Sequence, residues 1–157
     1  MKDDLQKIIG LKVDVDTYEG MKSGVPTLLD MLRQFNIKAS FFVPMGKDHT
    51  GWTVKRVFTR KGFLKKANRV GVLETYGIRT LMRGLLLPGP EIAKKNRLTL
   101  NEIVAQGHEV GIHGLDHVDW HDHIKEWDKT KTSAVLNRAC RVYEDLLGQK
   151  AHSFAAP

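Results

Sequence analysis

Residues 108–117 read His-Glu-Val-Gly-Ile-His-Gly-Leu-Asp-His, and this stretch decides how the rest of the chain is interpreted. His113 and His117 are four residues apart, so a helical turn opening at Gly114 would place both imidazoles on one face. Two imidazoles form part of a catalytic zinc site, which usually takes a third protein ligand and leaves one position open for water. The competing interpretation is a pair of histidines that share this spacing by accident.

A pair of aspartates far upstream offers the missing ligand. Residues 12–17 read Lys-Val-Asp-Val-Asp-Thr, and residues 8–15, which are rich in β-branched side chains, are expected to form a buried first strand. Asp14 and Asp16 would point the same way on one strand, so one could bind metal while the other takes a proton. A second apolar strand, residues 110–112, runs into the histidines. Two strand ends that deliver ligands to one rim are typical of active sites in α/β barrels.

The segment between these two motifs begins with a crossover unit. A helix is expected from Val25, with Pro26 in its first turn, to a stop at Asn36. Residues 39–43 then read Ala-Ser-Phe-Phe-Val and predict the second strand. The order strand, helix, strand is typical of two parallel strands, which indicates an α/β fold.

Capping residues predict the later helices. Thr99 is a credible N-cap for a short helix over residues 100–105, which Gly107 would close. Apolar residues at helical spacing predict a longer helix over residues 128–148. Residues 151–157 have the pattern of a new strand that has only begun.

These segments resemble a known family. Residues 13–17 and 107–117 are similar to the first two motifs of the polysaccharide deacetylase superfamily, also called the NodB homology or carbohydrate esterase 4 superfamily. Residues 25–29, 39–42 and 88–92 make the match closer. Together they resemble the branch that removes formyl from 4-deoxy-4-formamido-L-arabinose-phosphoundecaprenol. That branch acts in lipid A modification and in resistance to cationic peptides such as polymyxin.

The resemblance implies a fold and a mechanism. The fold would be the N-terminal part of a distorted (β/α) barrel with a basic helical insert. Asp16, His113 and His117 would bind one divalent metal ion, expected to be zinc, with manganese, cobalt or nickel as alternatives. Asp14 would be the catalytic base that takes a proton from the attacking water. The expected reaction is metal-dependent hydrolysis of an N-formyl group on a lipid-linked amino sugar, and the runner-up is N-acetyl deacetylation of peptidoglycan or another amino-sugar polymer.

Further polar and aromatic residues follow the second motif. His121 lies four residues beyond His117, so a third imidazole could face the same ion, but the family pattern of one Asp and two His favours Asp16. Trp120 and His121 are expected at the rim of the substrate site. His108 resembles a family position that packs beneath the strand. No pattern assigns a role to His49.

Composition indicates one globular domain. The chain has 157 residues, of which 41% are hydrophobic, and a lone Cys140 excludes an intramolecular disulfide. Neither a signal-peptide pattern nor a run of 18 apolar residues occurs, so we expect a cytoplasmic protein.

The net charge of +7 is concentrated in one segment. Residues 47–98 hold 13 Lys and Arg against 3 acids, interleaved with many apolar residues. Such a segment can lie on an anionic membrane surface, or it can pack on the barrel and expose a solvated charged face. The resemblance favours the membrane, because a polyprenyl-phosphate substrate requires an apolar surface beside positive charge. We therefore expect residues 1–157 to form an incomplete domain of this family with a membrane-facing insert at about 46–98, on the cytoplasmic face of the inner membrane.

Basic residues with interleaved aromatics also suit single-stranded nucleic acid. No recognised nucleic-acid motif occurs, and the metal-binding residues would have no role, so nucleic acid is not an expected partner.

A third hypothesis is that this chain alone is inactive. Residues 154–157 resemble the start of the third family motif, and the residues expected to follow would supply the catalytic acid and the partners of Asp14.

Overall fold

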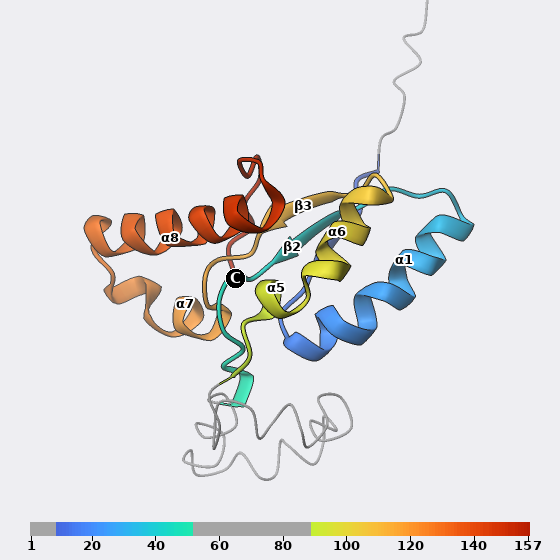
Figure 1. The fold of residues 1–157 in the computed structure, drawn as a ribbon. Coiled ribbons are helices and arrows are strands. Elements are labelled where there is room, and N and C mark those ends of the chain that lie inside the picture. The colour runs from blue at the N-terminus through green and yellow to red at the C-terminus, as the bar shows by residue number, and fades with distance from the viewer. Residues whose placement is uncertain (1–8, 52–88) are drawn as a thin grey trace, which may run out of the picture.

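The computed structural model describes residues 9–51 and 89–157, and a three-stranded parallel sheet lies at its centre (Figure 1). The strands, in their spatial order, are β1 (Lys12–Asp14), β2 (Ser40–Val43) and β3 (Glu109–Ile112). The register aligns Val13 with Phe41 and Phe41 with Val110. Because side chains alternate along a strand, these three apolar residues share one face of the sheet.

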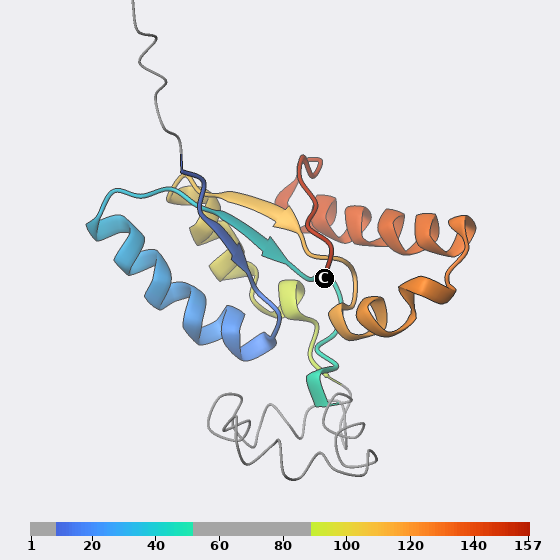
Figure 2. The ribbon, with the colours of Figure 1, turned by 180° about the vertical axis from the view of Figure 1, so that it is seen from behind.

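Helices cover that apolar face. The three longest of the described helices are α1 (Val25–Gln34), α6 (Arg97–Ala105) and α8 (Lys129–Leu147). Viewed from behind, the strands lie in front of α6 (Figure 2). The helices and the sheet enclose one core, whose fully buried members include Leu29, Phe41, Val43, Leu100, Ile103, Ala139 and Tyr143. This arrangement confirms the expected α/β fold with a parallel sheet.

The opposite face of the sheet is more polar. Lys12 forms an ion pair with Asp14 at 2.9 Å, and its ammonium lies 5.4 Å from the centre of the Phe42 ring. Ser40 donates a hydrogen bond to Glu109 on the neighbouring strand. Gly111 lies beside Phe42, and a Cβ atom there would come within 2.5 Å of the ring and of Ser153 Oγ. Glycine is therefore required by this close approach.

Within residues 9–49 and 89–157, four short elements connect the larger ones. They are the π-helical turn η1 (Gly20–Gly24), α5 (Ile92–Lys95), α7 (His117–His123) and the 3₁₀ turn η2 (Ile124–Glu126). Phe154 then forms a single parallel bridge with Ile112, where the sequence predicts a new strand. Asn36 has a positive φ of 52° directly after α1, which agrees with the stop expected there.

The ends of several elements differ from the sequence-based expectations. The first strand is confined to Lys12–Asp14, so Asp16 lies beyond the strand that was expected to hold it. Thr99 is not an N-cap, because α6 begins at Arg97 with Asn96 at its N-cap position. The buried Asn96 amide donates to the Ile92 carbonyl at 2.8 Å and so joins α5 to α6. The bounds of α8 agree well with the helix expected over residues 128–148. Asp128 is its N-cap, and Gly148 has the left-handed conformation at its end.

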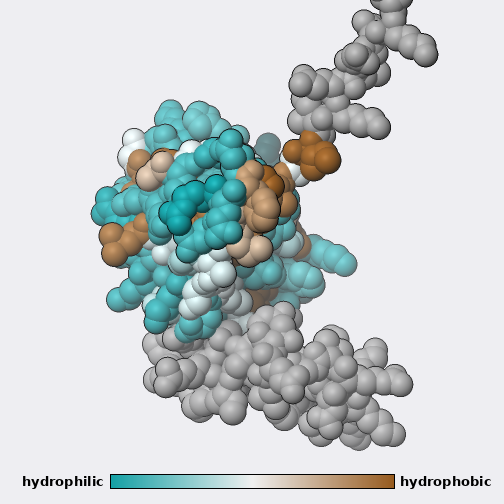
Figure 3. Space-filling view, turned by 90° about the vertical axis from the view of Figure 1, so that its right-hand side faces the viewer, coloured by the Kyte–Doolittle hydropathy of each residue, from teal (hydrophilic) through white to brown (hydrophobic). Residues whose placement is uncertain are grey.

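The surface seen from the side of α1 is largely hydrophilic with separate hydrophobic patches (Figure 3). Among the parts of the chain that the structure describes, no helix combines the length and the apolar character needed to cross a membrane. Most of the basic insert, residues 52–88, lies outside the described residues. The expectation of a helical, membrane-facing insert at about 46–98 therefore stays a prediction.

Candidate metal centre

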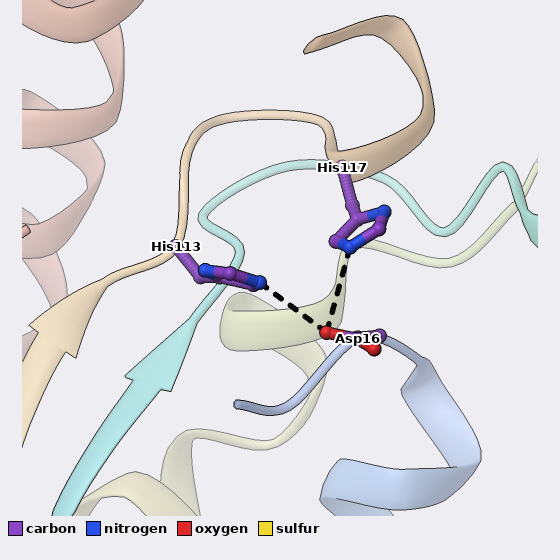
Figure 4. Close-up of side chains that lie close together, drawn as sticks. All are labelled: Asp16, His113 and His117. Atoms are coloured by element: carbon purple, nitrogen blue, oxygen red, sulfur yellow. Dashed lines mark ion pairs between the residues drawn. The ribbon is translucent and has the colours of Figure 1, made fainter. Parts of the chain in front are cut away.

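Three residues converge at the carboxyl ends of the strands. Asp16 follows β1, His113 follows β3, and His117 is the first residue of α7. Their side chains point toward one another from these three places (Figure 4). The carboxyl ends of parallel strands meet at one edge of a sheet, which is where α/β folds build their active sites.

The spacing of the donor atoms suits a metal ion. Each residue offers one ligand atom, and these atoms all lie within 4.8 Å of one another. His113 Nε2 and His117 Nε2 lie 3.3 and 3.6 Å from the same Asp16 oxygen. Ligand atoms about 2.0–2.2 Å from a tetrahedral zinc ion are separated by about 3.3–3.6 Å. Two imidazole nitrogens and one carboxylate oxygen also match the donor set of catalytic zinc sites, so the residues present fit the expected ion.

His113 is held rigidly. It is buried, and its backbone N–H donates to the Val43 carbonyl at 2.9 Å. Its ring Nδ1 lies 3.0 Å from the Ala155 carbonyl oxygen, which can only accept, so we assign the proton to Nδ1. The other ring nitrogen, Nε2, faces the Asp16 carboxylate. Either a second ring proton or a bound cation can bridge these two groups. A backbone carbonyl that orients the second imidazole nitrogen is common around metal-binding histidines.

His117 reaches the cluster by a different route from the one expected. The sequence predicts a helical turn from Gly114, but Gly114 has a positive φ of 73° and α7 begins only at His117. The Asp116 side chain caps α7 by accepting from the N–H groups of Val118 and Asp119 at 3.1 and 3.0 Å. The two imidazoles still come together, with ring centroids 5.3 Å apart, because a loop returns the chain toward His113.

The electrostatics favour the metal-binding protonation states. A hydrogen bond from His113, with a further contribution from the charge of His117, holds the pKa of Asp16 below its ordinary value despite partial burial. Burial lowers the pKa of His117, although the nearby Asp16 carboxylate opposes this effect. An ionised carboxylate and a neutral imidazole are the forms that bind a divalent cation. Asp16 is also half exposed, which leaves solvent access on its side of the cluster.

Other residues singled out by the sequence lie outside this cluster. Asp14 is exposed, forms the ion pair with Lys12, and is not among the clustered donors of the described residues. His121 is exposed and likewise outside it, so the alternative with a third imidazole is not favoured. Trp120 is buried in an aromatic group with Trp127 and Phe154, at ring-centroid distances of 5.6 and 5.5 Å. The rim roles of Trp120 and His121 stay predictions.

His108 has a structural environment. It is buried, and its Nδ1 accepts a hydrogen bond from the backbone N–H of Ala39 at 3.2 Å. Its ring also packs against Phe41 with the ring centroids 5.5 Å apart. Burial lowers its pKa, so the neutral ring is favoured. This environment agrees with the expectation that His108 packs beneath the strand.

No sequence pattern assigns a role to two residues that lie near the cluster. His49 forms an ion pair with Asp116, which caps the helix of His117. Asp48 is 1% exposed and accepts a hydrogen bond from the backbone of Tyr18, two residues after Asp16. Sequence patterns cannot indicate these contacts, because the partners are separated by 67 and 30 positions.

Comparison with known proteins is consistent with this geometry. The profile of the polysaccharide deacetylase family matches residues 2–157. The chain is 43% identical over 141 residues to the Shewanella sediminis protein named "Probable 4-deoxy-4-formamido-L-arabinose-phosphoundecaprenol deformylase ArnD", covering 90% of this chain and 46% of that protein. The protein of the same name from Wigglesworthia glossinidia brevipalpis is 32% identical over 140 residues, covering 88% and 48%. The chain thus spans about half the length of these curated relatives.

Solved structures share the fold. The peptidoglycan deacetylase PdaC of Bacillus subtilis aligns with a TM-score of 0.58 at 16% identity, covering 98% of this chain and 50% of that one. A carbohydrate esterase 4 family pseudoenzyme from Bacillus anthracis aligns with a TM-score of 0.56 at 20% identity, covering 96% and 35%. The parallel sheet with its helices is therefore part of a barrel of this type. Since the family profile covers nearly the whole chain and the fold agrees, this chain belongs to the polysaccharide deacetylase family.

Proposed function

We propose that this chain takes part in metal-dependent hydrolysis of an N-formyl group on a lipid-linked amino sugar, undecaprenyl phosphate 4-deoxy-4-formamido-L-arabinose. The observation that carries the proposal is the convergence of Asp16, His113 and His117 at one edge of the sheet. The names of the curated relatives supply the substrate class. The reaction belongs to lipid A modification and, through it, to polymyxin resistance.

Asp16, His113 and His117 would hold the ion, which we propose to be zinc. When bound, the ion supplies Lewis-acid chemistry that polarises an amide carbonyl and makes a water molecule more acidic. Asp14 accepts the proton of the attacking water at a carboxylate oxygen. The water oxygen bonds to the formyl carbon, the carbon–nitrogen bond breaks, and the leaving nitrogen takes up one proton, which balances the proton accepted by Asp14. Formate and the free amine are then released. The Ala155 carbonyl keeps the His113 ring in place during this reaction.

Formate release tests this proposal directly. The chain, completed with the remaining part of the Shewanella sediminis relative and loaded with metal, is incubated with the formamido sugar phosphate on a polyprenyl chain and, in parallel, with its N-acetyl counterpart. We expect formate from the first substrate in excess over acetate from the second, and no release by His113→Ala. Faster acetate release would instead support an amino-sugar deacetylase, and equal release by wild type and His113→Ala would refute the assigned centre.

We further propose that residues 47–98 dock on the anionic cytoplasmic face of the inner membrane. The support is the 13 cations among many apolar residues, since each cation near an anionic surface contributes about 1 kcal/mol. Sedimentation with anionic and neutral vesicles at two salt concentrations measures this binding. We expect binding to anionic vesicles that weakens with added salt, because salt screens exposed charges. Equal binding to both lipids would contradict the electrostatic part.

A further inference from the structure

The two ends of the insert meet beside the metal centre. We call residues 45–50 and 89–92 the neck, since they lead the chain into and out of the insert. Within the neck, the Ile92 N–H donates a hydrogen bond to the Gly46 carbonyl at 2.8 Å, and the Asp48 N–H donates one to the Pro90 carbonyl at 2.9 Å. Lys47 and Glu91 form an antiparallel bridge, and Gly89 lies so close to the Asp48 carbonyl that no Cβ would fit. The described part of the insert is therefore a tightly paired segment.

Asp48 connects the neck to the loop that carries Asp16. Its side chain is buried, and a buried carboxylate is costly unless hydrogen-bond donors satisfy it. One oxygen accepts from the N–H of Tyr18 at 2.8 Å, and the other accepts from the N–H and the hydroxyl of Thr50 at 3.0 and 2.6 Å. The Tyr18 contact is long-range in sequence, whereas the Thr50 contacts are local. Asp48 thus fixes the backbone two residues after Asp16.

The next neck residue contacts the loop that carries His117. The His49 ring pairs with Asp116, whose other oxygen caps the helix that begins with His117. In the same loop, the Gly114 carbonyl accepts a hydrogen bond from the Met45 backbone N–H at 3.1 Å. A Cβ at Gly46 would lie 2.3 Å from the Leu115 carbonyl oxygen, so the neck packs directly against the loop.

We propose that Asp48 and His49 are positioning residues for the metal centre, which they hold through Tyr18 and Asp116. This inference rests on the proposed metal-binding role of Asp16 and His117. Adjacent residues of one segment fix the two ligand-bearing loops relative to each other, so the neck sets the separation between the Asp16 carboxylate and the His117 imidazole. Outer residues that orient metal ligands typically contribute 10- to 100-fold to metal affinity.

Cobalt binding to the full chain tests the proposal, because the visible absorption of bound Co²⁺ reports ligand geometry. Asp48→Asn keeps the shape but offers one acceptor oxygen in place of two, and His49→Gln removes the imidazole. We expect each variant to bind Co²⁺ about 10- to 100-fold more weakly, with an altered absorption spectrum. Glu91→Gln and Asp119→Asn are matched controls, since among the described residues they disrupt exposed ion pairs with Lys94 and His123. Both controls should bind as wild type does.

Thr50→Val separates positioning from a merely structural role of Asp48. It removes the hydroxyl donor at 2.6 Å but leaves the Tyr18 contact intact. We expect Thr50→Val to lower the melting temperature of the metal-free protein while its cobalt spectrum stays that of wild type. If all three neck variants lose affinity in proportion to lost stability with unchanged spectra, the positioning role is refuted.

Different results would refute the metal centre and the positioning role. If wild type does not bind Co²⁺, the proposed metal centre itself is wrong. If wild type binds Co²⁺ and both Asp48→Asn and His49→Gln match its affinity and spectrum, only the positioning role is overturned.

Discussion

Replacing Gly111 by alanine tests the packing of β3, the strand that directly precedes His113. A Cβ at this position would lie 2.5 Å from Phe42 Cε1 and from Ser153 Oγ, and 2.7 Å from Phe42 Cδ1. These separations are well below ordinary van der Waals contact of about 3.5–4.0 Å. Phe42 is buried at 9% exposure and cannot simply rotate into solvent. The added methyl group must therefore displace the ring or separate the strands.

The expected cost follows from two opposing effects. Overpacking of this kind destabilises a protein by about 1–3 kcal/mol. Alanine also restricts the unfolded chain, which returns about 0.4–1 kcal/mol. We expect Gly111→Ala to lower the free energy of unfolding by about 1–2 kcal/mol, a large share of the about 5–15 kcal/mol typical of a domain. Urea unfolding followed by tryptophan fluorescence measures this difference.

A matched glycine provides the control. Gly24 has helical backbone angles, and a Cβ built there meets nothing within 4 Å. Gly24→Ala should leave the free energy of unfolding unchanged or raise it by up to about 1 kcal/mol. The double variant Phe42→Leu/Gly111→Ala should lose less stability than the sum of its single changes, because the smaller side chain relieves the clash. If Gly111→Ala is as stable as wild type, or the double variant is strictly additive, the close approach described here is refuted.

Three further predictions concern the centre and its surroundings. Asp16→Ala, His113→Ala and His117→Ala should each lose stoichiometric metal, as measured by elemental analysis of the purified protein; equal metal content in all variants and wild type would remove the site. In the completed chain, Asp14→Asn should keep its metal yet abolish formate release, because an amide cannot accept the proton from water; loss of metal together with activity would show that Asp14 is a ligand. Burial lowers the pKa of His108, so the unfolded chain binds more protons than the folded one between this lowered pKa and the ordinary value of about 6.5. The stabilisation from neutral His108 is therefore fully present above about pH 6.5 and is lost as the pH falls below it. His108→Gln should flatten this part of the curve of unfolding free energy against pH, and an unchanged slope in this variant would contradict the assignment.

The sequence by itself indicated the fold class and the clustered residues. Apolar runs predicted the three strands, and apolar residues at helical spacing predicted the long helix between Asp128 and Gly148. The Asp16 and His113 positions followed from apolar strands that run into polar residues. These features are local, because hydrophobic periodicity and capping depend on neighbours within a few positions.

Tertiary structure decided how those residues meet. The sequence predicted that a helical turn from Gly114 would bring His117 to His113, whereas a loop held by Met45 does so, with Gly114 at positive φ. A glycine fits either conformation at little cost, so long-range contacts such as this hydrogen bond select one. The contacts of Asp48 and His49 lie beyond sequence patterns for a related reason. Their partners are 30 and 67 positions away, and only the folded chain brings such groups within hydrogen-bonding distance.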